Sequence, residues 1–155
     1  MRLAAVNNFT VGSEELRKKI EERRKQHLNE SLSMRRKIQS VILMLNEIDL
    51  LLTFAARAEV PWKSVSDIGR ENAIRIMEEM PTFHIEREIA VRLEAQDRPI
   101  EQNDFRDMQT FCAVVRYADM VIAENMFSNL AQQAKLGKKY DTHIATDVRA
   151  VKAWL

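Results

Sequence analysis

Apolar residues recur at helical spacing along much of the chain, and the longest such run lies between Ser31 and Arg57. Within it, apolar positions step alternately by four and three residues, which gives a heptad-like seam: Met34, Ile38, Val41, Leu45, Ile48, Leu52 and Ala55. Neighbouring apolar residues widen this surface beyond one seam. The pattern predicts one long helix over residues 31–57, either central to its own fold or buried in a homo-oligomer or against a partner chain.

Shorter helices are predicted on both sides of this segment. Residues 14–29 carry both charges nearly all round, which favours a solvated helix with internal ion pairs and leaves nucleic-acid contact as the alternative. Helices over residues 66–79 and 83–96 follow, separated by Pro81, because the residue before a proline disfavours helical geometry. The second of these has one apolar face: Ile85, Ile89 and Leu93.

The stretch 103–125 combines another helix with a short strand. Asn103 is a good N-cap, and the following helix has an apolar face over about four turns. This face consists of Met108, Phe111, Cys112 and Val115. Tyr117 to Asp119 breaks the period, and Met120 to Ala123 then forms a short apolar run that suits a buried parallel strand.

Polar residues lie near the ends of these two elements. Glu124 and Asn125 come just past the predicted strand, and ligands of open α/β sheets bind outside the carboxyl ends of strands. Asp107, near the start of the preceding helix, can reach the same edge. The two positions are the minimum of a metal site, although an acid in a first helical turn also serves the helix dipole alone.

The remaining residues predict a second strand and two more helices. Residues 126–136 suit a helix that Gly137 ends, and residues 142–146, which alternate and include three β-branched side chains, suit a strand parallel to the first. A short terminal helix over 147–155 is expected, anchored by Trp154.

These elements predict a predominantly helical α/β fold with a short parallel sheet flanked by helices. A chain of 155 residues suits one domain with a sizeable core, and 3 Gly and 3 Pro suit a helical one. We expect a single domain over 1–155, made of a helical region over 13–79 and an α/β segment over 80–155.

Composition narrows the range of functions. The formal net charge of +1 gives no global attraction to nucleic acid, so any polyanion site would be local. A single cysteine, Cys112, allows no intramolecular disulfide and suits the reducing cytoplasm. The apolar run 41–56 contains charged residues and falls short of a membrane span, and no signal peptide is seen at Met1–Thr10. The three histidines lack metal-ligand spacing, and no Gly-rich phosphate loop is present.

Several short motifs resemble, in order and spacing, the C-terminal half of a PIN-like nuclease domain over residues 80–148. They are MPTFHIE at 80–86, the acid-opened helix NDFRD at 103–107, YAD at 117–119, and KYDT at 139–142 before a closing strand. In one bacterial PIN-like group the turn reads Pro-Tyr-Cys-Asp, where this chain has Arg116 and Ala118 in place of the Pro and Cys.

The resemblance implies a ribonuclease that uses Mg²⁺ or Mn²⁺ to hydrolyse a phosphodiester of RNA. Hard cations take oxygen ligands, so the implied site is built from acids and amides. Asp107 and Glu124 are then the implied catalytic residues. Asp107, Glu124 and Asn125 are implied metal ligands, and Asp104 is an implied supporting residue of the same metal site.

The match ends before residue 80. The family places an Asp after an N-terminal strand and another acid on an early helix, whereas residues 1–60 offer no such strand. Glu86 and Glu88 are the nearest further acids. The alternatives are a shortened chain, a decayed gene product, and a protein that completes its site with another chain. A non-enzymatic helical oligomer or partner-binding regulatory protein, built around residues 31–57, is the competing function.

Overall fold

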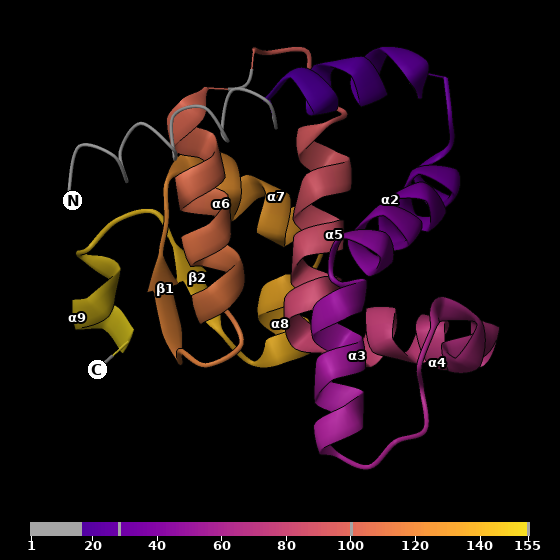
Figure 1. Ribbon diagram of the computed structural model, residues 1–155. Coiled ribbons are helices and arrows are strands. Elements are labelled where there is room, and N and C mark those ends of the chain that lie inside the picture. The colour runs from indigo at the N-terminus through magenta and orange to yellow at the C-terminus, as the bar shows by residue number, and fades with distance from the viewer. Residues whose placement is uncertain (1–16, 28, 100, 155) are drawn as a thin grey trace, which may run out of the picture.

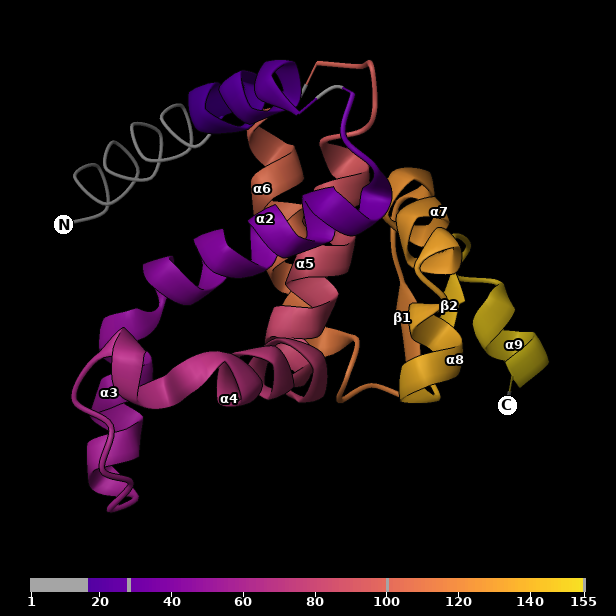
Figure 2. The same ribbon diagram turned by 90° about the vertical axis from the view of Figure 1, so that its right-hand side faces the viewer.

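One helix, α5 (Pro81–Leu93), lies in the middle of the molecule. In this computed structural model, which describes residues 17–27, 29–99 and 101–154, α5 contacts α2, α4, α6 and α7. Figures 1 and 2 show the helices α2, α3 and α4 on one side of α5, and α6, α7 and a small sheet on the other. Ile85, Ile89, Val91 and Leu93 of α5 are almost completely buried, as the predicted apolar face requires.

The helices and the two strands follow one another along the chain in the predicted order. After a helical segment at residues 17–26 come α2 (Leu32–Asn46), α3 (Ile48–Arg57), α4 (Val65–Glu79), α5, α6 (Gln102–Val114), β1 (Met120–Ile122), α7 (Asn125–Gln133), α8 (Leu136–Tyr140), β2 (His143–Ala145) and α9 (Ala150–Trp154). The two strands are parallel, with Val121 opposite Ile144, and α7 and α8 connect them. The predicted fold class, mainly helical with a short parallel sheet flanked by helices, is confirmed.

Two groups of buried side chains make up the core. The larger joins α5, α6, β1 and α7 and contains the whole predicted apolar face of α6, including the buried Cys112. The smaller joins α2, α4 and the start of α5 through Leu43, Ile68, Met77 and Phe83. Helix α5 therefore contributes buried side chains to both groups.

The predicted continuous helix over 31–57 is wrong. Ser31 caps α2 as its sequence suggests, but the backbone leaves helical geometry at Glu47, and the axes of α2 and α3 differ by 61°. The seam is buried within the chain only in part, since Ala55 is 6% exposed whereas Val41 and Leu45 are 58% and 56% exposed. The apolar surface of α2 is wide, and packing on α5 uses its other side, with Leu43 and Met44.

Several predicted boundaries shift for local reasons. The N-cap of α6 is Glu101, two residues before the predicted Asn103. Gly137 does not end a helix; it lies inside α8, where an added Cβ would come within 2.8 Å of the Thr142 carbonyl oxygen. Trp154 is 49% exposed and does not anchor α9.

The basic residues of the segment 17–26 serve the fold. Arg24 donates to the main-chain carbonyls of Leu93 and Glu94 at the end of α5, and to that of Arg98 beyond it. Arg23 pairs with the Glu94 carboxylate at 2.8 Å. Both side chains therefore tie this segment to the end of α5.

Among the described residues, no single helix has both the length and the apolar character needed to cross a membrane. Only α2 and α3 together pass that test, as a pair bent by 61°.

Candidate functional site

A cavity of about 210 Å³ lies between α6, β1 and the start of α7, and both predicted catalytic acids line it. Asp107 comes from α6, and Glu124 follows the carboxyl end of β1. The sequence alone predicted that these residues would share one edge of the sheet. Asp107 is half-buried, whereas Glu124 is exposed.

Local interactions fix the two elements that carry these acids. At the start of α6, the Asp104 carboxylate accepts the Glu101 main-chain N–H at 2.8 Å, in a reciprocal capping box. Asp107 follows within the next turn. Beyond β1, the Glu124 carbonyl accepts the Ser128 N–H, which places Glu124 at the N-cap of α7.

The other two predicted ligands take different positions. Asp104 is buried and does not line the cavity; besides the capping bond, it accepts Arg98 at 2.9 Å. It stabilises the start of α6 and the turn before it. Asn125, the first residue of α7, is exposed and also lies outside the cavity lining. Two of the predicted residues are thus brought together, and two are not.

Apart from Thr110, the other residues that line the cavity are apolar. Phe111 and Phe127 stack with their ring centroids 5.9 Å apart, and Val114 and Val121 line the wall beside them. Carboxylate oxygens fit Mg²⁺ or Mn²⁺ in kind. In number they fall short: in the part of the chain that the structure describes, no group of three Asp, Glu, His or Cys side chains is placed to hold a metal ion.

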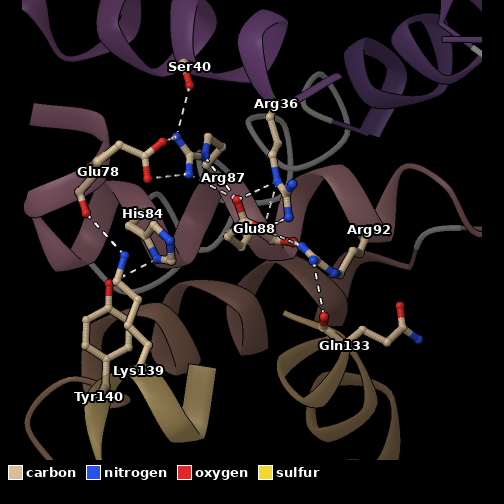
Figure 3. Close-up of polar contacts among 10 residues, drawn as sticks. All are labelled: Arg36, Ser40, Glu78, His84, Arg87, Glu88, Arg92, Gln133, Lys139 and Tyr140. Atoms are coloured by element: carbon tan, nitrogen blue, oxygen red, sulfur yellow. Dashed lines mark hydrogen bonds and ion pairs between the residues drawn. The ribbon is translucent and has the colours of Figure 1, made fainter. Parts of the chain in front are cut away.

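A second polar site, buried between α2, α5 and α7, was not predicted from the sequence. At its centre the Glu88 carboxylate pairs with Arg36 at 2.8 Å, Arg87 at 3.1 Å and Arg92 at 2.7 Å (Figure 3). Glu88 and Arg87 are 4% and 5% exposed. Arg92 also donates to the Gln133 carbonyl, so the group ties α2 and α7 to α5.

The charges of this group determine the protonation of Glu88. Burial by itself would raise the pKa of Glu88, but hydrogen bonds from Arg36 and Arg92 outweigh it and lower the pKa to about 2. Glu88 is therefore an anion with every oxygen engaged, and it does not serve as the further acid of a nuclease site. The Glu88–Arg92 spacing of four residues is visible in the sequence, but Arg36 lies 52 positions away.

His84 and Tyr140 extend the polar contacts toward α8. The Tyr140 hydroxyl lies 3.0 Å from His84 Nδ1, and Arg87 pairs with Glu78 at 2.7 Å beside them (Figure 3). Burial, then the nearby cations Lys139 and Arg87, lowers the pKa of His84 to about 4. A neutral His84 is thus part of the folded state.

This pKa predicts that stability falls as pH drops from about 6.5 to 4. In that window the unfolded chain binds a proton at His84 that the folded chain does not, so the free energy of unfolding decreases by up to about 3 kcal/mol. Urea unfolding at a series of pH values measures the slope. His84→Gln is expected to flatten it, while His143→Gln, at an exposed position, is expected to retain the parent's slope. Equal slopes in the parent and His84→Gln would contradict this role.

The two sites differ in what they can do. The buried group around Glu88 has its charges paired and lies away from solvent, so its role is to hold helices together. The cavity presents two carboxylates to solvent and is the candidate site for a ligand. Comparison with protein-family models, with curated proteins and with solved structures gives no match for this chain.

Proposed function

We propose that residues 80–148 carry part of a metal-dependent ribonuclease site, with RNA as substrate and Mg²⁺ or Mn²⁺ as cofactor. One observation supports it above all: Asp107 and Glu124, from separate elements, line one cavity at the carboxyl end of β1. The order of motifs that resembles a PIN-like domain adds to this. A bound divalent cation would stabilise negative charge on a phosphodiester.

The site needs further ligands. Two carboxylates are fewer than the three or four that the resemblance implies, and Asp104 and Glu88 are engaged elsewhere. Another chain is the source that we propose. The sheet is compatible with this. Within the described residues it has two strands, so each strand has one edge paired and one edge to which another chain could be added. We derive no reaction step from the two acids alone.

Metal binding tests the proposal. A cation that binds only the folded state stabilises it by mass action, so Mn²⁺ at roughly ten times its Kd is expected to stabilise the protein by about 1.4 kcal/mol. Asp107→Asn keeps the shape and removes one charge, and it should abolish this stabilisation. Calorimetric titration and thermal unfolding with and without Mn²⁺ measure both effects.

The control for this experiment is Asp97→Asn, an equal change of charge at an exposed residue outside the cavity. It is expected to bind Mn²⁺ as the parent does. No heat at millimolar Mn²⁺, or equal heats for the parent and Asp107→Asn, would refute a metal site at this cavity.

A second candidate function is that of a non-enzymatic partner-binding or oligomeric protein. The observation that favours it is the large number of exposed apolar side chains on α2, α3 and α4. They are Leu32, Met34, Val41, Leu45, Leu50, Phe54, Val65 and Ile74. Burying such a surface against another chain would be favourable through the hydrophobic effect.

A further inference from the structure

A groove of about 590 Å³ runs between α2 and α4. Its apolar lining consists of Val41, Met44 and Leu45 from α2 and Val65, Ile74 and Met77 from α4. Both helices rest on α5 (Figure 2), and Arg87 of α5 also contributes to the lining. The groove includes two residues of the seam that the sequence predicted to be buried, Val41 and Leu45.

The shape suits a helix better than a small ligand. Along α2 the lining extends from Ser33 to Leu45, a span of about 18 Å at a rise of about 1.5 Å per residue. Leu45, Val41 and Ile74 remain more than half exposed, so the groove is open along its length. Small-molecule sites usually enclose most of their ligand, whereas an amphipathic helix buries one face and leaves the other in water.

Charge at the rim identifies the kind of helix. Arg36 and Arg87 line the groove but are paired with Glu88 and Glu78. Lys37 and Arg70 also line the groove, are exposed, and have no ion pair within the described residues. The only acid in the lining, Glu78, is held by Arg87, so the rim is left with two uncompensated cations.

A second copy of this chain is a poor match for that rim. The helix α2 contains Arg35, Arg36 and Lys37 and no acidic residue. A copy docked through its own α2 would bring these cations toward Lys37 and Arg70. Like charges facing each other across an interface oppose association.

We propose that the groove between α2 and α4 docks an amphipathic helix of a partner protein, with apolar anchors on one face and acidic residues beside them. The anchors fill the space lined by Val41, Leu45 and Ile74, and the acids pair with Lys37 and Arg70. This inference develops the partner-binding candidate and is independent of the metal site. Failure of one therefore leaves the other standing.

A designed peptide tests the docking directly. The probe is a fluorescent helical peptide of about four turns with leucines at i, i+3, i+4 and i+7 and glutamates flanking them. Fluorescence anisotropy should show saturable binding to the full chain. A peptide of the same composition in scrambled order, and one with lysine in place of glutamate, should both bind at least about tenfold more weakly.

Variants of the groove then locate the site. Leu45→Asp places a charge among the anchors and should weaken peptide binding about a hundredfold, yet the chain should stay folded because Leu45 is half exposed. The double variant Lys37→Glu, Arg70→Glu should weaken binding of the acidic peptide about tenfold and strengthen that of the lysine peptide. Lys152→Glu, an exposed change on α9, should leave both affinities unchanged.

Three results would overturn the proposal. The first is no saturable binding of the acidic peptide at millimolar concentration, with circular dichroism showing a folded chain. The second is sedimentation as a dimer that Leu45→Asp converts to a monomer, which would assign the groove to a second copy. The third is binding to vesicles of anionic lipid that Leu45→Asp abolishes, which would assign it to a membrane surface.

Discussion

Replacing Glu88 with glutamine is expected to lower the free energy of unfolding by about 3–5 kcal/mol, because it removes the carboxylate that the buried Arg87 and Arg92 guanidinium groups share. Arg87 and Arg92 are 5% and 9% exposed, so water cannot replace the lost carboxylate. Arg87 retains the Glu78 carboxylate, whereas Arg92 retains only main-chain carbonyl acceptors, which carry no full negative charge. Urea unfolding at neutral pH measures the loss.

The chain provides a matched control in an exposed pair of the same chemistry. Glu79 and Arg75 lie four residues apart on α4 and are 62% and 68% exposed. Glu79→Gln is expected to cost at most about 0.5 kcal/mol, because exposed pairs contribute little. If Glu88→Gln and Glu79→Gln cost the same, the buried charges do not hold the helices as described.

Acid adds a second readout for Glu88. Its pKa of about 2 means that the folded state keeps the carboxylate charged after the unfolded chain has begun to take up a proton. This contribution to stability is complete above the ordinary Glu pKa of about 4.5 and is lost as pH falls toward 2. In Glu88→Gln that part of the acid-induced loss should disappear.

Phe127→Ala is expected to destabilise the protein by about 3–5 kcal/mol, the usual effect of removing a buried aromatic ring. Phe127 is 1% exposed, and its ring stacks on Phe111 where α6 meets α7. Without the ring, α7 loses this stacking contact with α6, and the void adds to the cavity that Asp107 and Glu124 line. Thermal and urea unfolding measure the change.

Phe54→Ala is the matched control for this substitution. Phe54 is 54% exposed on α3, so its removal should cost less than about 1 kcal/mol. Phe127→Leu, which keeps much of the volume, should fall between the two alanine variants. A parent-like Phe127→Ala protein would show that the larger core does not depend on this contact.

The parts of the fold that sequence could predict are those set by local pattern. The apolar faces of α5 and α6, from Ile85 to Leu93 and from Met108 to Val115, follow from helical periodicity, and each is buried. The two strands followed from short apolar or β-branched runs with a helix between them. Ligands bind outside the carboxyl ends of strands in such sheets, and β1 follows α6 after a short turn. The sequence could therefore place Asp107, near the start of α6, beside Glu124, just past β1.

The features that sequence could not predict depend on distant residues or on single torsions. The break between α2 and α3 comes from the backbone angles of Glu47 alone, and no proline or glycine marks it. The pairing of Arg36 with Glu88 joins positions 52 residues apart. Helix α2 has apolar side chains on more than one face, so periodicity could not decide which face would meet α5.

The position of α5 as a wall of both cores also governs how the protein opens locally. Helices α2 and α4 contribute side chains to the smaller core. Their amide hydrogens can exchange with solvent when these two helices detach while α5 stays packed on α6 and α7. The larger core cannot open first while the smaller one stays intact, because detaching α5 from the larger core also removes the surface on which α2 and α4 rest. The amides of α5 and of the larger core should therefore exchange most slowly, as the last cooperative unit to unfold. The amides of α2 and α4, on either side of the groove, should exchange faster.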